Sequence, residues 1–374
     1  MTFKELNIIP QILKAVEEQG YEKPTEIQEQ AIPVILSKRD IIGCAKTGTG
    51  KTASFTIPII QLLQSQQIQD KSRKIQALIL TPTRELALQI SDCIKDYAKY
   101  TNIKHGVIFG GVNQEPQNKM LRKGIDILVA TPGRLLDLIN QGYIKLNDIR
   151  YFVLDEADRM LDMGFINDIK RIISKLPERR QTLLFSATIP SSITSLTNKI
   201  LKNPVRINIS TESAPTEQIE QLLYFVEKKD KSNLLISILK EEKNQSVLVF
   251  SRTKHNANNI VKKLVKAGIG SEALHGNKSQ TSRQTALSNF KTGKTRVIVA
   301  TDIASRGIDI NELPLVINFD LPEVPETYIH RIGRTGRAGH SGRAVSFCSQ
   351  EERKLVNGIQ KLMGVKINQA VTAV

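Results

Sequence analysis

Short runs of apolar residues alternate along this chain with longer segments in which apolar residues return every three or four positions. Such runs are typical of strands buried on both faces, and the longer segments are typical of amphipathic helices. One helical stripe consists of Leu86, Ile90, Ile94 and Tyr97. In the first half of the chain the runs lie at residues 40–44, 77–80, 107–109, 125–129, 151–154 and 182–185. The alternation predicts an α/β fold with a mostly parallel sheet and helices on both faces.

A second alternating series follows a break in this pattern. Its runs lie at residues 222–226, 247–250, 273–275, 297–300, 315–319 and 344–348. The stretch between the two series, residues 210–217, is rich in Ser, Thr and Glu and contains Pro215, which is typical of a linker. A chain of 374 residues is long enough for two domains. We therefore expect a first α/β domain at 1–209, a linker at 210–217 and a second α/β domain at 218–374.

The loop after the first apolar run has the composition of a phosphate-binding loop. It leads from a predicted strand into a predicted helix, and its small residues allow backbone N–H groups to turn toward phosphates. Lys51 would meet the β- and γ-phosphates, and the Thr52 hydroxyl would face a Mg²⁺ ion. The residues expected around the nucleotide are Ala45, Lys46, Thr47, Gly48, Thr49, Gly50, Lys51 and Thr52. The usual pattern begins with Gly where this loop has Ala45, and the alternative is an ordinary flexible loop.

Two acidic residues follow the apolar run at 151–154. Asp155 stands at the end of that predicted strand, where a second Mg²⁺ ligand is found opposite a phosphate loop. Glu156 is then placed to orient or deprotonate the attacking water. The alternative is that these carboxylates only complement the dipole of a following helix.

Three arginines, Arg331, Arg334 and Arg337, recur at three-residue spacing among glycines. We expect that they cannot pack in a core and that they reach into a shared polar cleft. Arginine side chains can stabilise the charge that develops on a transferred phosphoryl group. The alternative is a solvated basic turn.

The charge of the chain predicts a polyanionic partner. The formal net charge is +16, and Lys and Arg side chains neutralise phosphates and release counterions. A basic surface that serves solubility alone is the alternative. Aromatic residues make up 5% of the chain and Trp is absent, which favours a grip on the sugar–phosphate backbone over base stacking.

The sequence also bears on location. No apolar stretch reaches the length of a membrane span, and the N-terminus lacks the shape of a signal peptide. Cys44, Cys93 and Cys348 are isolated, without the spacing of a disulfide framework or a metal site. We therefore expect a cytoplasmic protein with no membrane partner.

Taken in order, these motifs resemble those of the DEAD-box ATP-dependent RNA helicases, most closely the bacterial RhlE-like branch. The matching stretches are residues 20–28, 45–52, 82–87, 110–111, 131–134, 155–158, 186–188, 249–253, Gln280 with Arg283, 300–309 and 330–337. The family form of the phosphate loop does begin with Ala. Two departures are Lys46 in place of a frequent Gln and Ser305 in place of Ala. The resemblance implies two tandem RecA-like domains that close on ATP and single-stranded RNA.

The resemblance also implies roles for single residues. Tyr21 would stack on the adenine, Gln28 would read its edge, and Asp309 would contact the ribose. The remaining residues implied for the nucleotide are Lys23 and Gly307, and those implied for catalysis or its coupling to RNA are Ser186, Thr188, His330, Arg334 and Arg337, the last two as arginine fingers.

The residues implied for RNA binding lie in both domains. They are Pro82, Arg84, Gly111, Thr131, Gly133 and Arg134 in the first, and Arg252, Gly276, Arg283, Thr301 and Arg306 in the second. The residues themselves support part of this set, because helices that open directly after strands offer backbone N–H groups to phosphates.

The expected function is an ATP- and Mg²⁺-dependent RNA helicase that separates short duplexes as its two domains close. An ATP-gated RNA clamp that assembles ribonucleoproteins and a DNA translocase remain the alternatives. We expect a monomer with little RNA sequence specificity. By analogy with RhlE-like relatives, its setting would be ribosome assembly or RNA turnover, with ribonucleoprotein or RNA-decay partners.

Overall fold

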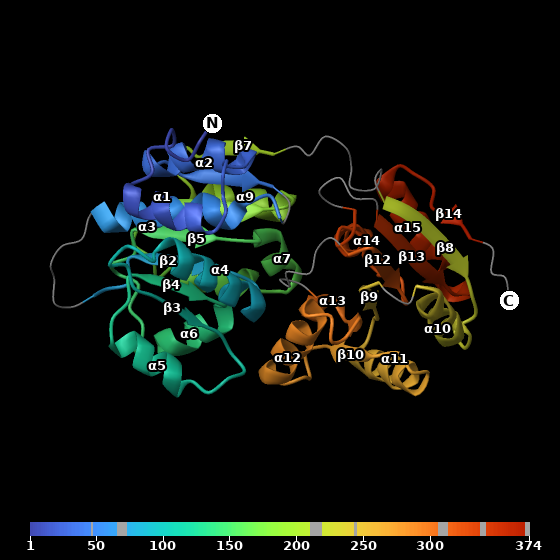
Figure 1. Ribbon diagram of the computed structural model, residues 1–374. Helices are drawn as coiled ribbons and strands as arrows, with labels where there is room; N and C mark the ends of the chain where they lie inside the picture. The colour runs from blue at the N-terminus through green and yellow to red at the C-terminus, as the bar shows by residue number, and fades with distance from the viewer. Residues whose placement is uncertain are drawn as a thin grey trace. The chain divides into compact units, whose positions relative to one another are not determined.

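The chain divides into two compact units, which span Met1–Ser210 and Thr211–Val374 (Figure 1). The computed structural model describes residues 1–45, 48–65, 73–209, 219–242, 245–305, 313–336 and 342–370, without the side chains of Ile303 and Ser305. The expected linker at 210–217 lies outside the described residues. No helix in the described part of the chain combines the length and the apolar character that crossing a membrane requires.

The first unit is a parallel sheet with helices on both faces. Its strands are β1 (Ile41–Cys44), β2 (Ala77–Leu80), β3 (His105–Ile108), β4 (Ile127–Ala130), β5 (Tyr151–Leu154), β6 (Gln181–Ser186) and β7 (Val205–Asn208). Its helices are α1 (Pro10–Glu18), α2 (Glu26–Leu36), α3 (Lys51–Ser65), α4 (Arg84–Tyr97), α5 (Glu115–Arg122), α6 (Pro132–Asn140), α7 (Ala157–Asp162), α8 (Ile166–Ile173) and α9 (Ser191–Ile200). The strand order is β3-β4-β2-β5-β6-β1-β7, and each pairing is parallel.

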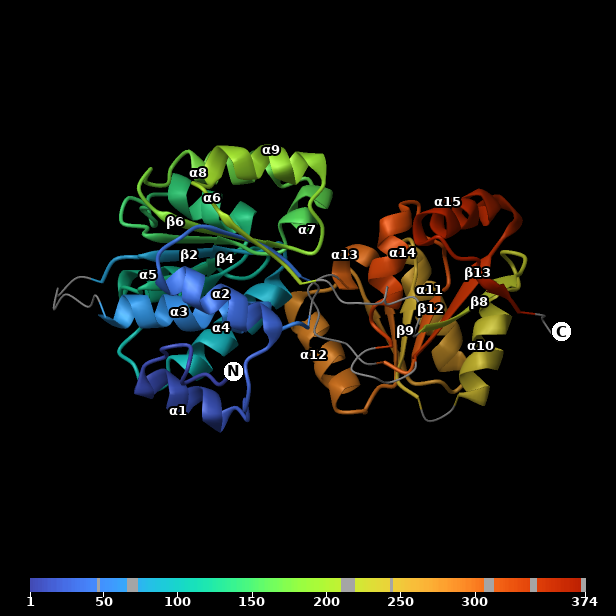
Figure 2. The same ribbon diagram turned by 90° about the horizontal axis from the view of Figure 1, so that it is seen from above.

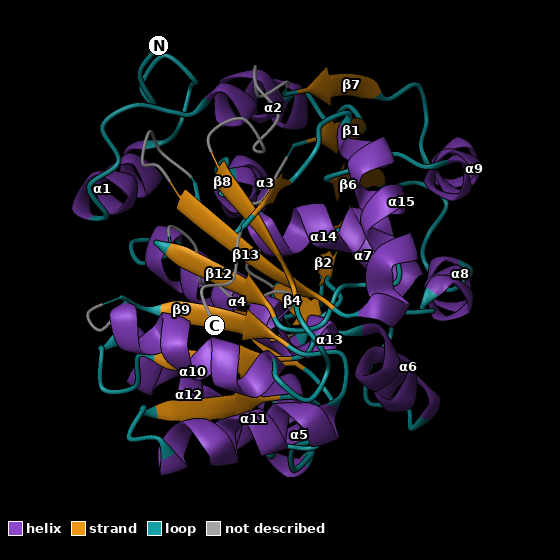
Figure 3. Cartoon of the chain, turned by 90° about the vertical axis from the view of Figure 1, so that its right-hand side faces the viewer, coloured by secondary structure: helices purple, strands orange, loops and turns teal. Residues whose placement is uncertain are grey.

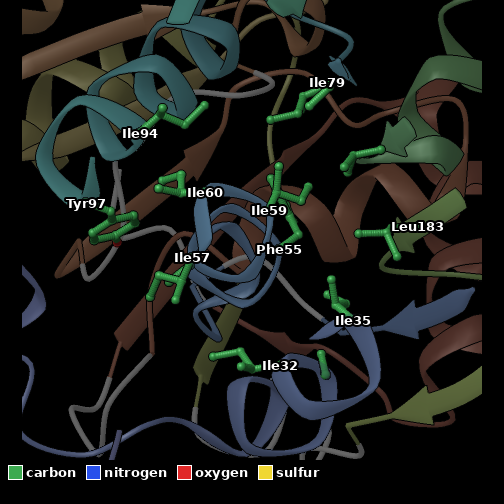
Figure 4. Close-up of a cluster of buried hydrophobic side chains, with 14 of the residues drawn as sticks. Ile32, Ile35, Phe55, Ile57, Ile59, Ile60, Ile79, Ile94, Tyr97 and Leu183 are labelled. Carbon is green, nitrogen blue, oxygen red and sulfur yellow. The ribbon is translucent and has the colours of Figure 1, made fainter. Parts of the chain in front are cut away.

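The two faces of this sheet bury alternate strand residues under different helices. Helices α1 to α4 pack on the face to which Ile79 and Leu183 point, and α6 to α9 pack on the face of Leu80 and Leu184. Figure 4 shows α3 at the centre of the first core, where Phe55 and its neighbours meet side chains of α2, α4 and the strands. The helix that follows the phosphate loop is therefore held by packing along much of its length, which fixes the loop relative to the sheet.

The second unit repeats this architecture. Its strands are β8 (Ile219–Phe225), β9 (Val247–Phe250), β10 (Ser271–Leu274), β11 (Val297–Ala300), β12 (Leu315–Asn318), β13 (Gly342–Cys348) and β14 (Asn368–Gln369). Its helices are α10 (Lys231–Glu241), α11 (Lys254–Lys266), α12 (Gln280–Lys291), α13 (Asp302–Ser305), α14 (Pro325–Ile332) and α15 (Arg353–Met363), with a 3₁₀ turn at Gln350–Glu352. The strand order is β10-β11-β9-β12-β13-β8-β14, and each pairing is parallel.

Helices cover both faces of this second sheet as well. Helices α10 and α11 share one core with the strands, and α12 to α15 contribute to the cores on the other face. Figure 2 shows α10 and α15 on opposite sides of the sheet, and Figure 3 shows β8, β13, β12 and β9 side by side.

The sequence pattern predicted the fold class correctly and missed two strands. The apolar runs at 77–80, 151–154, 247–250 and 297–300 coincide with strands whose residues are all buried. The missed strands, β7 and β14, are edge strands, and only Ile207 in β7 is buried. A strand covered on so little of its surface does not need a continuous apolar run, so its pattern is weak.

Candidate functional site

The carboxyl ends of parallel strands lie along one edge of each sheet, and this edge collects most of the candidate residues. In the first unit, the neighbouring strands β5, β6 and β1 lead into the candidate nucleotide residues. The neighbouring strands β3, β4 and β2 lead into the candidate RNA residues. The border lies between β2 and β5, where the backbone N–H of Asp155 donates to the carbonyl of Leu80 at 2.9 Å. Two adjacent binding regions therefore share one edge.

The phosphate loop has the backbone geometry that a cradle for phosphates requires. Gly48 and Gly50 have φ angles of 88° and 92°, a conformation that residues with a Cβ rarely adopt. A Cβ at Gly50 would also collide with the side-chain amide of Gln28. Lys51 is the first residue of α3 and is buried, so its ammonium group is held at the helix start. Lys46 and Thr47 lie outside the described residues.

Gln28, which is expected to read the adenine edge, holds the phosphate loop in this structure together with Thr25. Thr25 is the N-cap of α2, and its hydroxyl donates to the carbonyl of Thr49 at 2.8 Å. The Gln28 amide donates to the carbonyl of Gly50 at 3.1 Å and accepts from the N–H of Thr25 at 3.0 Å. The side-chain amide therefore links the start of α2 to the loop that would surround the phosphates.

The aromatic candidate for adenine stacking is accessible. Tyr21 is 43% exposed, and its hydroxyl lies 3.3 Å from that of the buried Tyr97 on α4. This contact holds the Tyr21 ring beside α4 and leaves part of it open. Lys23 is exposed two residues further on.

The two acidic candidates differ in environment. Asp155 is 3% exposed, and burial raises the pKa of its carboxyl to about 6, while the charge of Lys51 opposes the shift. Glu156 occupies the left-handed region at φ 52° and ψ 49°, an unusual and strained conformation for this residue type. Both carboxylate oxygens of Glu156 accept from Nη1 of Arg159 at 2.8 Å, inside the protein.

Sequence reasoning missed Arg159, although a signal was present. Arg159 lies three residues after Glu156, and this spacing places two side chains on one face of a helix. Because a buried charge needs a partner, Arg159 fixes where the Glu156 carboxylate lies.

The stretch after β6 is tied to the acidic motif through Asp158. One carboxylate oxygen of Asp158 accepts from the N–H groups of Ala187 and Thr188 at 3.1 and 2.9 Å, and from the Thr188 hydroxyl at 3.0 Å. The Ser186 hydroxyl accepts from the N–H of Asp158 at 3.2 Å and donates to the carbonyl of Thr188 at 2.7 Å. Residues 186–188 are therefore held to the start of α7.

The candidate RNA residues of the first unit form one group. Arg84 opens α4, and its guanidinium lies so close to Gly111 that a Cβ at Gly111, where φ is 75°, would collide with it. Thr131 is the N-cap of α6, and Arg134 donates to the carbonyl of Val112 at 3.2 Å. The loops after β2, β3 and β4 therefore contact one another. Of the remaining candidates, Pro82 is buried and Gly133 is exposed.

In the second unit, Arg252 follows β9 and is held by a residue that the sequence did not suggest. Its side chain is 41% exposed, and Nη2 contacts a carboxylate oxygen of Glu352 at 2.8 Å and the carbonyl of Leu321 at 3.2 Å. Glu352 is buried and also binds the ammonium of Lys231 at 2.6 Å. The spacing of Ser349 and Glu352 fits a capping box, a signal that was readable in the sequence.

The other candidates of this edge lie after the neighbouring strands β10 and β11, with Arg283 on α12. Gly276 is exposed and Thr301 is half-buried. Arg283 is 8% exposed and donates to the carbonyl of Ala304 at 3.4 Å. A contact of Arg283 with RNA therefore stays a prediction. Arg306, Gly307 and Asp309 lie outside the described residues.

The expectation that the three spaced arginines cannot pack in a core is wrong for Arg331. Its side chain is 2% exposed, and Nε and Nη2 contact the two carboxylate oxygens of Asp302 at 2.6 and 2.8 Å. Its guanidinium also lies 4.9 Å from the centre of the Phe250 ring. A bidentate carboxylate, carbonyl acceptors and an aromatic face compensate the buried charge. Arg334 is also buried, His330 is half-buried, and Arg337 lies outside the described residues.

Two tandem RecA-like units, with a phosphate loop in the first, define the class of this protein. The DEAD/DEAH box helicase family model matches residues 25–196, and the helicase conserved C-terminal domain matches residues 230–339. The chain is 43% identical to the RNA helicase CrhR of Synechocystis over 98% of its own length and 73% of that relative. It is 40% identical to the DEAD-box ATP-dependent RNA helicase CshA of Bacillus subtilis, over 99% of this chain and 74% of the relative.

Solved structures agree with the family models. Dbp5 of S. cerevisiae bound to RNA and ADP BeF3 has a TM-score of 0.85 and 32% identity, over 99% of this chain and 95% of that one. A DEAD box protein from Methanococcus jannaschii is 42% identical over 99% of both chains, with a TM-score of 0.55. The chain therefore belongs to the DEAD-box ATP-dependent RNA helicases. Its place in the RhlE-like branch stays a prediction.

Proposed function

We propose that this chain hydrolyses ATP in response to RNA and uses the cycle to separate short RNA duplexes. The observation that carries the proposal is the strand order of the first sheet. This order brings the phosphate loop, with the buried Asp155 and Glu156, next to a basic group of loops with Arg84 and Arg134 on one edge. The family membership and the relatives named for RNA helicase activity support the same reading.

ATP would bind at the loop after β1. Lys51 would hold the β- and γ-phosphates, and Tyr21 would stack on the adenine. Gln28 would then exchange its hydrogen bond to Gly50 for the adenine edge, so that nucleotide binding removes one of the side-chain links from α2 to the loop and leaves that of Thr25. The hydrogen bond from Gln28 to Gly50 and the exposed ring of Tyr21 support these assignments.

A Mg²⁺ ion fits the residues at this edge. Asp155 and the Thr52 hydroxyl would hold it, and the ion would neutralise the phosphate oxygens. Asp155 suits this assignment because it is buried directly after β5 and its carboxylate oxygens are of the ligand type that Mg²⁺ prefers.

Glu156 would take the proton from the attacking water. The hydrogen bonds from residues 186–188 to Asp158 would couple the candidate hydrolysis site to the rest of the unit. In this proposal, binding of ATP and RNA closes the two units, and Arg334 and Arg337 stabilise the charge on the γ-phosphate.

RNA would be held by its backbone, at Arg84 and Arg134 in one unit and Arg252 in the other. We also propose, from the resemblance alone, a cytoplasmic monomer that acts in ribosome assembly or RNA turnover.

The test is Glu156→Gln, with the exposed Glu178→Gln as the control for loss of a carboxylate elsewhere in the unit. RNA-stimulated ATPase activity should fall by about 10²–10⁴-fold, while binding of RNA and of an ATP analogue persists. Equal hydrolysis by Glu156→Gln and the parent would remove Glu156 from the mechanism. Strand displacement and ATPase assays with RNA and DNA duplexes complete the test. RNA-stimulated ATPase activity without strand displacement would indicate an RNA clamp. ATPase activity that is stimulated by DNA would indicate a DNA translocase.

A further inference from the structure

The positive charge of the second unit is concentrated in one stretch of chain. Between residues 245 and 301 the only acidic residue is Glu272. The basic residues of this stretch are Arg252, Lys254, Lys262, Lys263, Lys266, Lys278, Arg283, Lys291, Lys294 and Arg296. On either side of it, acidic and basic residues nearly balance, so most of the unit's excess positive charge comes from this stretch.

The fold keeps this stretch together at one end of the sheet. It contains the adjacent strands β9, β11 and β10 with helices α11 and α12 (Figure 1). Glu272, the acidic residue of this stretch, forms hydrogen bonds within it: its carboxylate accepts from the Asn289 side chain at 2.8 Å and from the Thr295 hydroxyl at 2.7 Å. Arg296 is also engaged internally, through carbonyls that include that of Glu242 at 3.0 Å. The cations that remain accessible lie mainly on the helices.

Helix α11 presents these cations on one face. Ala257, Ile260 and Leu264 are buried against the sheet. At about 100° per residue, Lys262 and Lys266 fall on the opposite side of the helix and are exposed. The helix itself contains no acidic residue. A surface that serves only solubility usually mixes both signs of charge, and this face does not.

The row of lysines begins at the candidate RNA edge. Lys254 follows Arg252 and Thr253, and its ammonium donates to the side chain of Asn277 at 3.2 Å, next to the exposed Gly276. Helix α11 then runs away from that edge. From Lys254 to Lys266 it rises about 18 Å, at 1.5 Å per residue. This length matches about five phosphates along one strand of a nucleic-acid helix, at an axial spacing of about 3.4 Å per phosphate.

The electrostatic environment at the start of the row is positive. Burial first, and then the charges of Lys278 and Lys254, lower the pKa of His275 at the end of β10. A phosphate that enters this region would therefore meet a favourable field.

We propose that the outer face of α11 is a second RNA-backbone surface, which continues the candidate edge and holds RNA that flanks the bound strand. The inference rests on RNA as the substrate. Its chemistry is charge complementarity with phosphates, so it carries no sequence preference. Lys262 and Lys266 contribute to it and lie outside the candidate catalytic and RNA-binding residues.

The test uses the double variant Lys262→Gln/Lys266→Gln in the full chain. The matched control is Lys354→Gln/Lys361→Gln, which makes the same charge change at exposed positions of α15, on the opposite face of the sheet. Binding is measured without nucleotide, as affinity against salt, for single strands of about 6 and about 20 nucleotides. The slope of log affinity against log salt should become shallower by about 1.4 for the longer RNA, or about 0.7 for each lost phosphate contact. Binding of the shorter RNA and the basal ATPase rate should not change.

Three results would overturn the inference. They are an equal change of slope in the control variant, an unchanged slope in the α11 variant, and an equal loss of affinity for the shorter RNA. The proposed function fails separately, if RNA does not stimulate the ATPase activity of the parent chain. The binding assay needs no nucleotide and still decides the role of α11 in that case.

Discussion

The buried ion pair between Arg159 and Glu156 leads to a prediction that requires no ligand. Arg159→Met keeps an unbranched side chain and removes the charge. Glu156 then loses the two 2.8 Å contacts from Nη1 and stays inside the first unit. We expect this change to destabilise the unit far more than its position in a short helix would suggest.

The size of the effect follows from the burial of the pair. Opposite charges about 4 Å apart attract by about 4 kcal/mol at an effective dielectric constant of 20. Removing one member of a buried pair costs about 3–5 kcal/mol, because the other charge is left uncompensated. For a unit of about 200 residues, a loss of 4 kcal/mol lowers the melting temperature by roughly 8–16 °C. Glu156→Gln should lower the free energy of unfolding by a similar amount, because it leaves the Arg159 guanidinium buried without its carboxylate partner.

The double variant Arg159→Met/Glu156→Gln separates the interaction energy of this ion pair from other effects of the two substitutions on stability. It should be more stable than the sum of the single changes indicates, by about 2–3 kcal/mol. The assay is urea unfolding of the full chain, with hydrogen exchange at β5 and β6 to report the first unit. Arg171→Met is the control, because Arg171 is 60% exposed and lies 3.7 Å from Asp168, a pair worth about 0–1 kcal/mol. The reasoning is refuted if the changes in unfolding free energy of the two single variants add up, within about 0.5 kcal/mol, to that of the double variant.

Three further predictions follow from other contacts. Gly50→Ala should lose ATP-analogue binding while Gly142→Ala keeps it, because both glycines have positive φ but only a Cβ at Gly50 collides with a neighbouring side chain; equal losses would contradict this. Asp302→Asn should weaken the bidentate contact of the buried Arg331 and destabilise the second unit by about 3 kcal/mol in urea unfolding, with exchange at β11 and β12 as the local measure. His275 should be neutral at pH 7, because its pKa is lowered in the folded unit. The stability that it contributes is therefore present above the ordinary pKa of 6.5 and is lost as pH falls through the lower folded value; an NMR titration with a midpoint at or above 6.5 would contradict this.

The fold class was readable in the sequence because strands buried on both faces must be apolar along their whole length. The runs at 77–80 and 297–300 are such strands, and their bounds match. The sequence signal failed where burial is partial, as in β7 at the sheet edge. The stripe from Leu86 to Tyr97 was equally clear, because α4 buries one face.

The chemistry was readable where it depends on adjacent residues, and it was missed where it depends on distant ones. The phosphate loop and the acidic motif are local in sequence. The contact between Arg252 and Glu352 spans 100 residues, and only the packed second unit brings the two side chains together. Arg331 shows the same limit, because its half-buried partner Asp302 lies in a separate motif and the spacing of the arginines gave no sign of it.

The hydrogen bond from the Asp155 N–H to the Leu80 carbonyl joins the two halves of the first edge. Leu80 lies two residues before Pro82, and Asp155 lies beside the strained Glu156. In the proposed function, RNA bound at the loop after β2 would pull on the peptide that carries the metal-binding candidate, through the parallel pairing of β2 with β5. Under that proposal, communication between substrate and nucleotide would have a mechanical route inside the first unit alone, over a path as short as the spacing of two neighbouring strands.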